Sequence, residues 1–370
     1  MMNNKIRVLP KPPKKKLGFP WTEETSPSVY DPSIQYPKIT IITPSFNQGQ
    51  YIEETIRSVL LQNYPNLEYI IIDGGSDDNT LEIINKYEKW IDYWVSEPDN
   101  GQAHAINKGL KYATGKVFNW LNSDDTLRKN ALFEVGRAFL DDKLHVAAFR
   151  EYHIVGEEII RKTKGTTIAK SLEATLAQFH IDQPSTFFRL NRLKKIGRLQ
   201  ESLHYLFDAE MWIRYLLING LDGCQKFNYY STNFRLHEHS KTVASQELFQ
   251  NEIHTLLLAL LNFSTIDVQS INHLLEKNQQ NIAFAKQVVI NWSSCEINTD
   301  LFNHHLENRI GWYAFNIKNP AIIRQVDMKM PFLKSNFTFA YYKAFLYRQF
   351  CLVFSNRQIE ILLHLWRKIF

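Results

Sequence analysis

The chain has 370 residues, of which 44% are hydrophobic and 22% charged, a composition typical of a globular protein with about two domains. Its 3 cysteines are widely spaced, which excludes a disulfide framework and a CxxC zinc motif and fits a reducing, cytoplasmic setting. No run of about 18 apolar residues exists, so no membrane-spanning helix is expected. A formal net charge of +5, without a nucleic-acid-binding motif, gives no reason to expect nucleic acid as a partner.

The first segment, residues 1–37, is rich in proline and lysine, and we expect an extended or loosely packed leader there. Strand and helix patterns then alternate along the chain, with short polar connections between them. The expected elements are a strand at 38–43, a helix at 51–61, a strand at 67–72, a helix at 81–90, a strand at 93–96, a helix at 103–113 and a strand at 116–121.

This alternation predicts an α/β fold in which a mostly parallel sheet is covered by helices on both faces. Ligands of open α/β sheets bind outside the carboxyl ends of the strands, so loops that are distant in sequence should converge there. Polar residues gather at these predicted strand ends, and they are Ser45, Asn47, Asp73, Glu97, Asp99, Asp124 and Asp125.

Asp124 and Asp125 follow the apolar run 117–121 after Asn122 and Ser123. Two adjacent carboxylates repel each other, and they persist most easily where a hard cation or a cationic substrate shares the site. A simple turn is the alternative, because Asn, Ser and Asp are also common turn residues. The glycine fingerprints of Rossmann dehydrogenases and of P-loop enzymes are both absent from the sequence, which argues against those two classes.

Segments in a characteristic order carry a resemblance to a known family. They are ITIITPSFNQ at 39–48, IIIDGGSDDNT at 70–80, EPDNGQAHAINKG at 97–109 and NWLNSDD at 119–125. In this order the segments resemble glycosyltransferase family 2, over about residues 38–242. The resemblance implies a GT-A fold (nucleotide-diphospho-sugar transferase), a nucleotide-diphospho-sugar donor and inversion at the anomeric carbon.

The resemblance also implies a donor site and a divalent cation, Mn²⁺ or Mg²⁺. Asp125 is expected to bind the metal directly and Asp124 to contact the ribose or support the site, although which of the two is the direct ligand stays open. Asn122 stands where many relatives have a first Asp. The residues expected to bind the nucleotide-sugar are Thr43, Pro44, Ser45, Phe46, Asn47, Asp73, Asp99, Gly101, Gln102, Asn107, Asp124, Gln183 and Arg235.

The second half is expected to carry a helix at 133–140, strands at 145–149, 158–163, 183–189 and 227–234, and an apolar helix from about 204 to 216. Asp208 begins that helix and resembles the family's catalytic base, with Glu210 as runner-up and helix capping as the structural alternative. Phe207 replaces the acid usual beside the base. His237 lies in an R-x-H pattern whose histidine joins the metal or the diphosphate in relatives, or else it is a surface-loop residue.

We therefore expect a leader at 1–37, a nucleotide-sugar-binding half at 38–125, an acceptor-binding half at 126–244 and a helical region at 245–370. The expected acceptor is a glycan or a lipid-linked glycan. The tail beyond residue 330 is basic and aromatic, which suits peripheral contact with the anionic inner face of the membrane, or packing on the catalytic domain. The alternatives to a transferase are a catalytically inactive nucleotide-sugar-binding protein of the same fold, and a nucleotidyltransferase.

Overall fold

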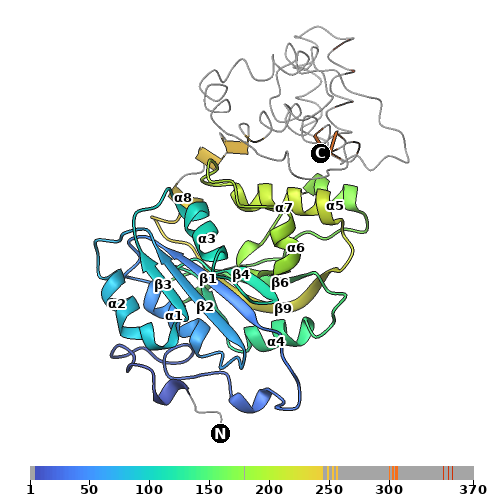
Figure 1. Cartoon of the computed structure of the whole chain (residues 1–370). Coiled ribbons are helices and arrows are strands. Elements are labelled where there is room, and N and C mark those ends of the chain that lie inside the picture. Colours follow the sequence, from blue (N-terminus) through green and yellow to red (C-terminus); the bar gives the residue numbers. More distant parts are fainter. Residues whose placement is uncertain are drawn as a thin grey trace. The chain divides into compact units, whose positions relative to one another are not determined.

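Figure 1 shows the computed structural model of the chain, which describes residues 5–178, residues 180–244 and isolated residues between 248 and 352. The chain divides into two compact units. The first contains Met1–Ile168, His180–Tyr215 and Leu221–Gln246, and the second contains Ala169–Phe179, Leu216–Gly220 and Glu247–Phe370. The predicted helices after residue 245 and the basic tail lie outside the described residues. In the described part, no helix combines the length and the hydropathy that a membrane span requires.

The parallel half of the sheet confirms the predicted alternation. Strands β3, β2, β1 and β4 are neighbours in this order, and all of their pairings are parallel. Every residue of β1 is buried, as expected for a central strand with helices on both faces. The elements of this half are β1 (Ile39–Ser45), α1 (Ile52–Leu60), β2 (Leu67–Asp73), α2 (Thr80–Tyr87), η3 (Glu88–Trp90), β3 (Tyr93–Ser96), α3 (Gln102–Leu110) and β4 (Val117–Trp120).

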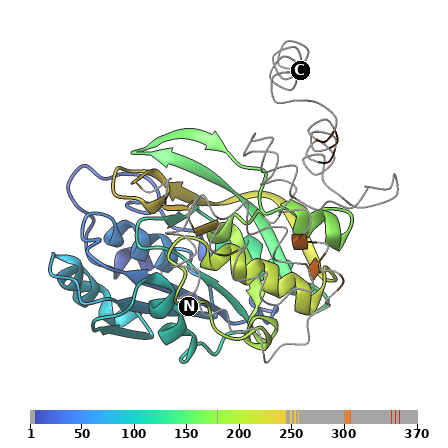
Figure 2. The ribbon, with the colours of Figure 1, turned by 90° about the horizontal axis from the view of Figure 1, so that it is seen from above.

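The second half extends the same sheet, with β8 antiparallel to β4, β6 antiparallel to β8, and β9 parallel to β6. The segment predicted as a strand from residue 183 begins instead with a 3-10 turn, η4. Figure 2 shows β6 and β7 as a green two-stranded ribbon that extends beyond the rest of the sheet. The elements are β5 (Thr126–Leu127), α4 (Ala131–Ala138), β6 (Val146–Val155), β7 (Glu158–Lys162), α5 (Leu172–Gln178), η4 (Gln183–Ser185), β8 (Thr186–Arg189), α6 (Leu190–Lys195), α7 (Phe207–Asn219), β9 (Cys224–Arg235) and α8 (Lys241–Ala244).

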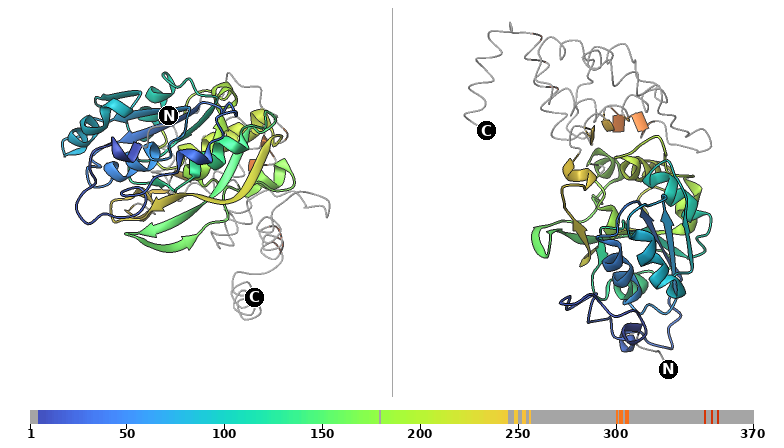
Figure 3. Two further views of the ribbon diagram at one scale, coloured as in Figure 1. Left: turned by 90° about the horizontal axis from the view of Figure 1, so that it is seen from below. Right: turned by 90° about the vertical axis from the view of Figure 1, so that its left-hand side faces the viewer.

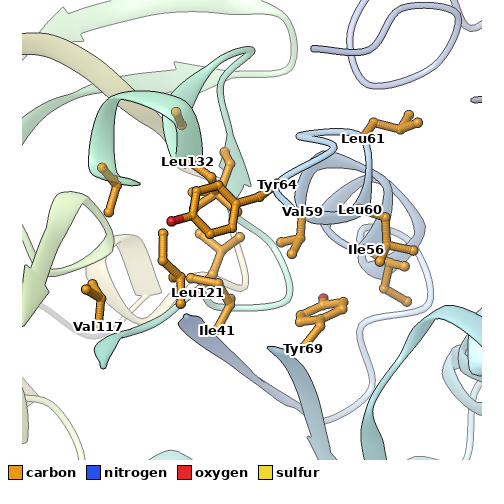
Figure 4. Close-up of a cluster of buried hydrophobic side chains, with 14 of the residues drawn as sticks. Ile41, Ile56, Val59, Leu60, Leu61, Tyr64, Tyr69, Val117, Leu121 and Leu132 are labelled. Carbon is orange, nitrogen blue, oxygen red and sulfur yellow. The ribbon is translucent and has the colours of Figure 1, made fainter. Parts of the chain in front are cut away.

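One hydrophobic core joins the two predicted halves. Figure 4 shows Ile41 of β1, Val59 of α1, Tyr69 of β2 and Leu132 of α4 in this core, and all four side chains are fully buried. Because α4 belongs to the second half, both predicted halves contribute to this core, and both contribute strands to the same sheet.

The leader is packed, so the expectation of a loose segment was wrong. Leu9, Trp21, Tyr30 and Tyr36 are buried, and the Tyr30 hydroxyl donates to the carbonyl of Gln62 at 2.7 Å. Two short 3-10 helices, η1 (Lys5–Arg7) and η2 (Pro27–Val29), interrupt it. Proline content suggested an unpacked chain, but these apolar side chains anchor the segment to the core. Figure 3 (right) shows the leader in dark blue at the opposite end of the unit from α8.

Arg57 on α1 holds the leader in place. Its guanidinium is fully buried and donates to the carbonyls of Pro20 at 2.9 Å, Pro10 at 2.8 Å and Trp21 at 2.8 Å. A fourth hydrogen bond reaches the Tyr87 hydroxyl at 3.1 Å. A planar fork with several donors satisfies leader carbonyls that have lost contact with water.

We expect Arg57→Ala to destabilise the fold by about 3 kcal/mol or more, because hydrogen bonds to a charged donor contribute about 1.5–3 kcal/mol each and are not additive. Urea unfolding followed by tryptophan fluorescence measures the change. Arg137→Ala is the matched control, since Arg137 is 64% exposed in its ion pair with Glu134, and it should cost at most about 0.5 kcal/mol. Equal unfolding midpoints for the two variants would remove the anchoring role of Arg57.

Candidate active site

The loops that follow β1, β2 and β3 meet at one edge of the sheet. Ser45 pairs in register with Asp73, and Asp73 pairs with Ser96, so the three strands end side by side. A Cβ atom placed on Gly74 would lie 3.0 Å from Oδ2 of Asp99 and 3.3 Å from the ring of Phe46. A side chain at position 74 would therefore crowd Asp99 and Phe46, and the predicted convergence at the carboxyl ends of the strands is present.

Within the first loop, only part of the predicted nucleotide-binding set faces solvent. Thr43, Pro44 and Ser45 are buried in β1. Phe46 is 60% exposed, although it is a large apolar side chain in the middle of the polar loops. The side chain of Asn47 accepts from the N–H of Asp77 at 3.0 Å, which ties the first loop to the second.

Asp73 supports the second loop from inside the protein. Its Oδ2 accepts from the N–H groups of Gly75 at 3.0 Å and Ser76 at 2.9 Å, and from the Ser96 hydroxyl at 2.6 Å. Its Oδ1 accepts from the Ser76 hydroxyl at 2.5 Å. The side chain is fully buried. Asp73 thus shapes the loop that follows β2, and any contact with a nucleoside requires it to exchange one of these bonds.

The start of α3 is linked to the segment that carries Asp124 and Asp125. Asp99 accepts from the N–H of Gly101 at 2.7 Å, and Gly101 adopts φ +104°, a conformation that favours glycine. The amide of Gln102 donates to Oδ1 of Asn122 at 2.6 Å. Residues from the third loop and from the end of β4 are therefore joined by a side-chain hydrogen bond.

Two residues predicted to bind the nucleotide-sugar are hydrogen-bonded within the protein. Asn107 donates to the carbonyl of Leu199 at 2.9 Å and to Glu201 at 2.8 Å, and it accepts from the N–H of Leu199 at 2.9 Å. Gln183 donates to Oδ1 of Asn119 and to the carbonyl of Trp120, both at 2.9 Å. Both amides are buried and hydrogen-bonded within the protein, so the structure shows a structural role for each of them.

The two adjacent aspartates have different surroundings. Oδ2 of Asp124 lies 3.1 Å from Nε2 of His237, and these side chains are 20% and 11% exposed. Asp125 is buried; its Oδ1 accepts from the backbone N–H of Arg235 at 2.9 Å and its Oδ2 accepts from Asn122 at 3.3 Å. Burial, reinforced by the neighbouring charge of Asp124, raises the pKa of Asp125 well above its ordinary value.

Arg235 has partners within the protein. Its Nε donates to the carbonyl of Asp124 at 2.9 Å, and its guanidinium forms an ion pair with Glu54 at 3.1 Å. The guanidinium also lies 5.2 Å from the ring centre of Tyr51, and that ring lies 4.7 Å from the imidazole of His237. Tyr51 and Glu54 were not predicted from the sequence, since a tyrosine and a glutamate at a helix start are ordinary residues.

The residues at this edge suit a divalent cation. Carboxylate oxygen and neutral imidazole are suitable ligands for Mn²⁺, and Mg²⁺ commonly takes one or two carboxylates together with phosphate oxygens and water. Within residues 5–178 and 180–244, no group of three or more His, Cys, Asp or Glu side chains has the arrangement of a complete metal site. Asp124 and His237 are the side chains at this edge that would offer a carboxylate oxygen and an imidazole nitrogen to such a cation.

Asp208 stands at the start of α7, beside this edge. The ring of Phe207 lies 6.0 Å from that of Trp120, the last residue of β4. Lys241 donates to the carbonyl of His204 at 2.9 Å and to Gln102 at 3.1 Å, which ties the entry of α7 to α3. Asp208 accepts from the N–H of Ala209 at 2.7 Å and is half-buried.

Glu210, the runner-up for the base, is occupied elsewhere. Its two oxygens accept from Nε and Nη2 of Arg214, both at 2.8 Å, and the side chains of both residues are buried. Arg214 also donates to the carbonyls of Ile196 and Arg198. Both oxygens of Glu210 are thus engaged in a buried bidentate ion pair, which favours Asp208 over Glu210 as the candidate base.

Glu210→Gln should destabilise the fold by about 3–5 kcal/mol, because it leaves the Arg214 charge buried without its counter-ion. Urea unfolding measures this loss, and Glu23→Gln is the control, since the Glu23–Lys129 pair is about half exposed, at 52% and 44%. Catalytic rates per folded molecule should stay near wild type. A catalytic defect without a stability defect would return Glu210 to the list of candidate bases.

Residues 40–214 match the family model of "Glycosyl transferase family 2". An uncharacterized glycosyltransferase of Rickettsia typhi is 29% identical over 202 residues, which are 50% of this chain and 60% of the relative. The putative teichuronic acid biosynthesis glycosyltransferase TuaG of Bacillus subtilis is 36% identical over 142 residues, which are 37% of this chain and 53% of TuaG. The match thus spans between half and two thirds of these relatives.

The fold has a counterpart among solved structures. The crystal structure of S. aureus TarS superposes with a TM-score of 0.50 and 19% sequence identity, over 78% of this chain and 50% of TarS. At this identity the likeness concerns the fold alone, and it agrees with the GT-A arrangement of the mixed sheet. The family-model match assigns residues 40–214 to glycosyltransferase family 2.

Proposed function

We propose that the protein is a metal-dependent, inverting glycosyltransferase of the hexosyltransferase type. It moves a sugar from a nucleotide-diphospho-sugar to a hydroxyl of a glycan or of a lipid-linked acceptor. The observation that carries the proposal is the Asp124–His237 pair, 3.1 Å apart, at the edge of the sheet where the loops after β1, β2 and β3 meet. A cation held there neutralises charge on the leaving diphosphate when it is bound.

Asp124 and His237 are assigned as the protein's metal ligands. The sequence led us to expect Asp125, rather than Asp124, as the direct carboxylate ligand. The buried Asp125 holds the backbone of Arg235, and the Arg235 side chain holds the carbonyl of Asp124. This arrangement fixes the direction of the Asp124 carboxylate before any ligand binds. Phe46 is assigned to stack on the nucleobase, because its exposed ring lies among the three loops.

Asp208 is assigned as the general base. It removes the proton of the acceptor hydroxyl while the hydroxyl oxygen attacks the anomeric carbon from the face opposite to the diphosphate, and the configuration therefore inverts.

The name of TuaG, a relative at 36% identity, supports a role in the synthesis of a cell-surface polysaccharide. We place the protein in the cytoplasm, with peripheral contact at the inner face of the membrane through the basic tail. Cosedimentation with anionic vesicles tests the contact: removal of the residues after Met330 should abolish binding, and unchanged binding would disprove it.

A panel of UDP-, GDP- and dTDP-sugars with Mn²⁺ tests the activity. At least one donor should release its nucleoside diphosphate, and EDTA should stop the release. Asn122 and Phe207, which replace acids usual in the family, favour the competing function of an inactive nucleotide-sugar-binding protein. Tight nucleotide binding without release or transfer from any donor would establish that alternative.

A further inference from the structure

Three basic side chains surround two stacked tyrosines on the strands of the second half. The rings of Tyr152 on β6 and Tyr230 on β9 are parallel within 3°, with their centres 4.1 Å apart. The guanidinium of Arg128 lies 4.4 Å from the ring centre of Tyr152, and Nζ of Lys162 lies 5.7 Å from it. The guanidinium of Arg150 lies 5.8 Å from the ring centre of Tyr230. Since all of these contacts involve the same two rings, the five side chains form one surface, which we call the basic patch.

The positive charges of the basic patch are not neutralised by the protein itself. Lys162 is exposed, and Arg128 and Arg150 are half-buried. Within residues 5–178 and 180–244, none of the three forms an ion pair with a carboxylate. Like charges that are held close together repel one another, and an anion from outside the chain relieves this repulsion. The basic patch therefore has the charge of an anion-binding surface.

Lys226 adds a further positive charge beside the patch. It lies on β9 opposite Ala148 of β6, two residues before Arg150. Partial burial lowers the pKa of Lys226; Asp182 raises it, and the positive charges of Arg150 and Lys164 lower it further. The repulsion between these bases shows that the positive field extends along β9, beyond the tyrosine pair.

The tyrosine rings support the basic groups and leave their donors accessible. A guanidinium that lies over an aromatic ring contacts it through its flat face, so the N–H groups at its edge can still donate hydrogen bonds. Arg128 uses one of them, since its Nη1 donates to Oδ1 of Asn233 at 3.2 Å. The fork of a guanidinium matches the two oxygens of a carboxylate. Acidic groups with one negative charge each therefore suit this surface.

The basic patch adjoins the candidate active site. Arg128 lies three residues after Asp125 in the chain, and its partner Asn233 lies two residues before Arg235. Lys162 lies on β7, which pairs with β6 and belongs to the ribbon that extends beyond the rest of the sheet in Figure 2. The patch thus reaches from β5 across β9 and β6 to β7, about 14 Å at the usual spacing of strands.

We propose that the basic patch binds the acidic groups of an anionic glycan acceptor, a chain whose sugar residues carry single negative charges such as the carboxylate of a uronic acid. The proposal rests on the proposed transferase function and specifies its acceptor class. Separate cations on adjacent strands suit charges that recur along a chain, and the diphosphate of the donor is assigned to Asp124 and His237 instead. An acceptor chain that reaches the active site would extend over the patch, because the two surfaces adjoin.

Calorimetric titration of the full chain with hexagalacturonate tests the proposal without any need for turnover. The matched neutral probe is the fully methyl-esterified hexagalacturonate, which has the same sugars without their charges. The wild type should bind the acidic form about 10-fold more tightly or better, since two or more exposed charge contacts are lost with the ester. Raising the salt from about 0.05 M to about 0.5 M NaCl should remove most of this difference, because salt screens exposed charges.

The double variant Arg150→Gln with Lys162→Gln should weaken binding of hexagalacturonate by about 3- to 30-fold, the combined effect of two exposed charge contacts. Lys89→Gln with Lys195→Gln is the matched control, because it removes the same charge from exposed positions on η3 and α6. It should leave binding unchanged. Release of nucleoside diphosphate from a donor without acceptor should stay near wild type in both double variants. Lys162→Gln alone, at an exposed position on β7, keeps the test valid if Arg150→Gln does not fold.

Tyr152 gives a second readout. Tyr152→Leu removes the ring on which Arg128 and Lys162 lie, and it should weaken binding of hexagalacturonate by about 3-fold or more, the value of an exposed cation–π contact. Tyr152→Phe keeps the ring and should bind as the wild type does. Thermal unfolding of both variants is measured on the same preparations, so that a loss of binding can be separated from a loss of structure.

The proposal is overturned if the wild type does not bind hexagalacturonate, if the methyl ester binds equally well, or if the double variant of the patch retains full affinity. Patch-dependent binding to phosphatidylglycerol vesicles without binding to hexagalacturonate would assign the surface to a membrane instead. The transferase function fails separately, when no donor releases its nucleoside diphosphate. In that case the titration still decides the surface: binding that is lost in the double variant supports it, and no binding refutes it.

Discussion

Asp208→Asn is expected to lower sugar transfer by about 10²- to 10⁴-fold, the usual contribution of a general base. The amide keeps the shape of the side chain and its bond from the N–H of Ala209, but it cannot take the proton of the acceptor hydroxyl. Nucleotide binding should stay near wild type, because the donor loops lie on other elements. Transfer is measured as product formed, and nucleotide binding by calorimetry on the same preparations.

Asp142→Asn serves as control, since the side chain of Asp142 is 97% exposed and far from these contacts in the chain. It should leave transfer unchanged. If Asp208→Asn transfers sugar at the wild-type rate, the base lies elsewhere. If it loses nucleotide binding to the same extent as transfer, Asp208 contributes to the donor site instead.

The parallel half of the fold was predictable because each of its strands is a short apolar run bounded by turn residues. β1 and β2 are buried along nearly their whole length, so hydrophobicity alone marks them. The second half was harder to predict. β5 has only 2 residues and α6 only 6, too few for any periodicity to appear. The leader was misjudged because packing by Trp21 and Tyr30 depends on partners far along the chain.

Within the candidate site, too, some residues could be predicted from the sequence and others could not. Asp99 and Asp124 were predicted as site residues because they follow strands of a parallel sheet, and ligands bind outside the carboxyl ends of such strands. The structural bonds of Asn107 and Gln183 could not be predicted, since their partners lie up to 94 residues away in sequence. The different roles of Asp124 and Asp125 depend on their burial and on their contacts with Arg235. The sequence does not indicate these differences, because the two residues are identical and adjacent.

Asp124→Asn is expected to weaken Mn²⁺ binding by about 10²-fold or more in the presence of a nucleoside diphosphate, and to lower transfer accordingly, because a direct carboxylate ligand is replaced by a neutral amide. His237→Ala should weaken binding less, since a water molecule can occupy the position of the imidazole. Electron paramagnetic resonance of free Mn²⁺ measures the affinity directly and does not depend on turnover.

Asp125→Asn separates the structural assignment from the sequence-based one. If Asp125 supports Asp124 through Arg235, the amide should change Mn²⁺ affinity by about 10- to 100-fold at most, as for residues that orient a ligand without touching the metal. A variant that loses Mn²⁺ binding completely, while Asp124→Asn retains it, would restore Asp125 as the direct ligand. The buried position of Asp125 argues against that result, because its two oxygens already accept hydrogen bonds from Arg235 and Asn122. The contact of Asp124 is with the imidazole of His237, and a cation can displace that imidazole from the hydrogen bond.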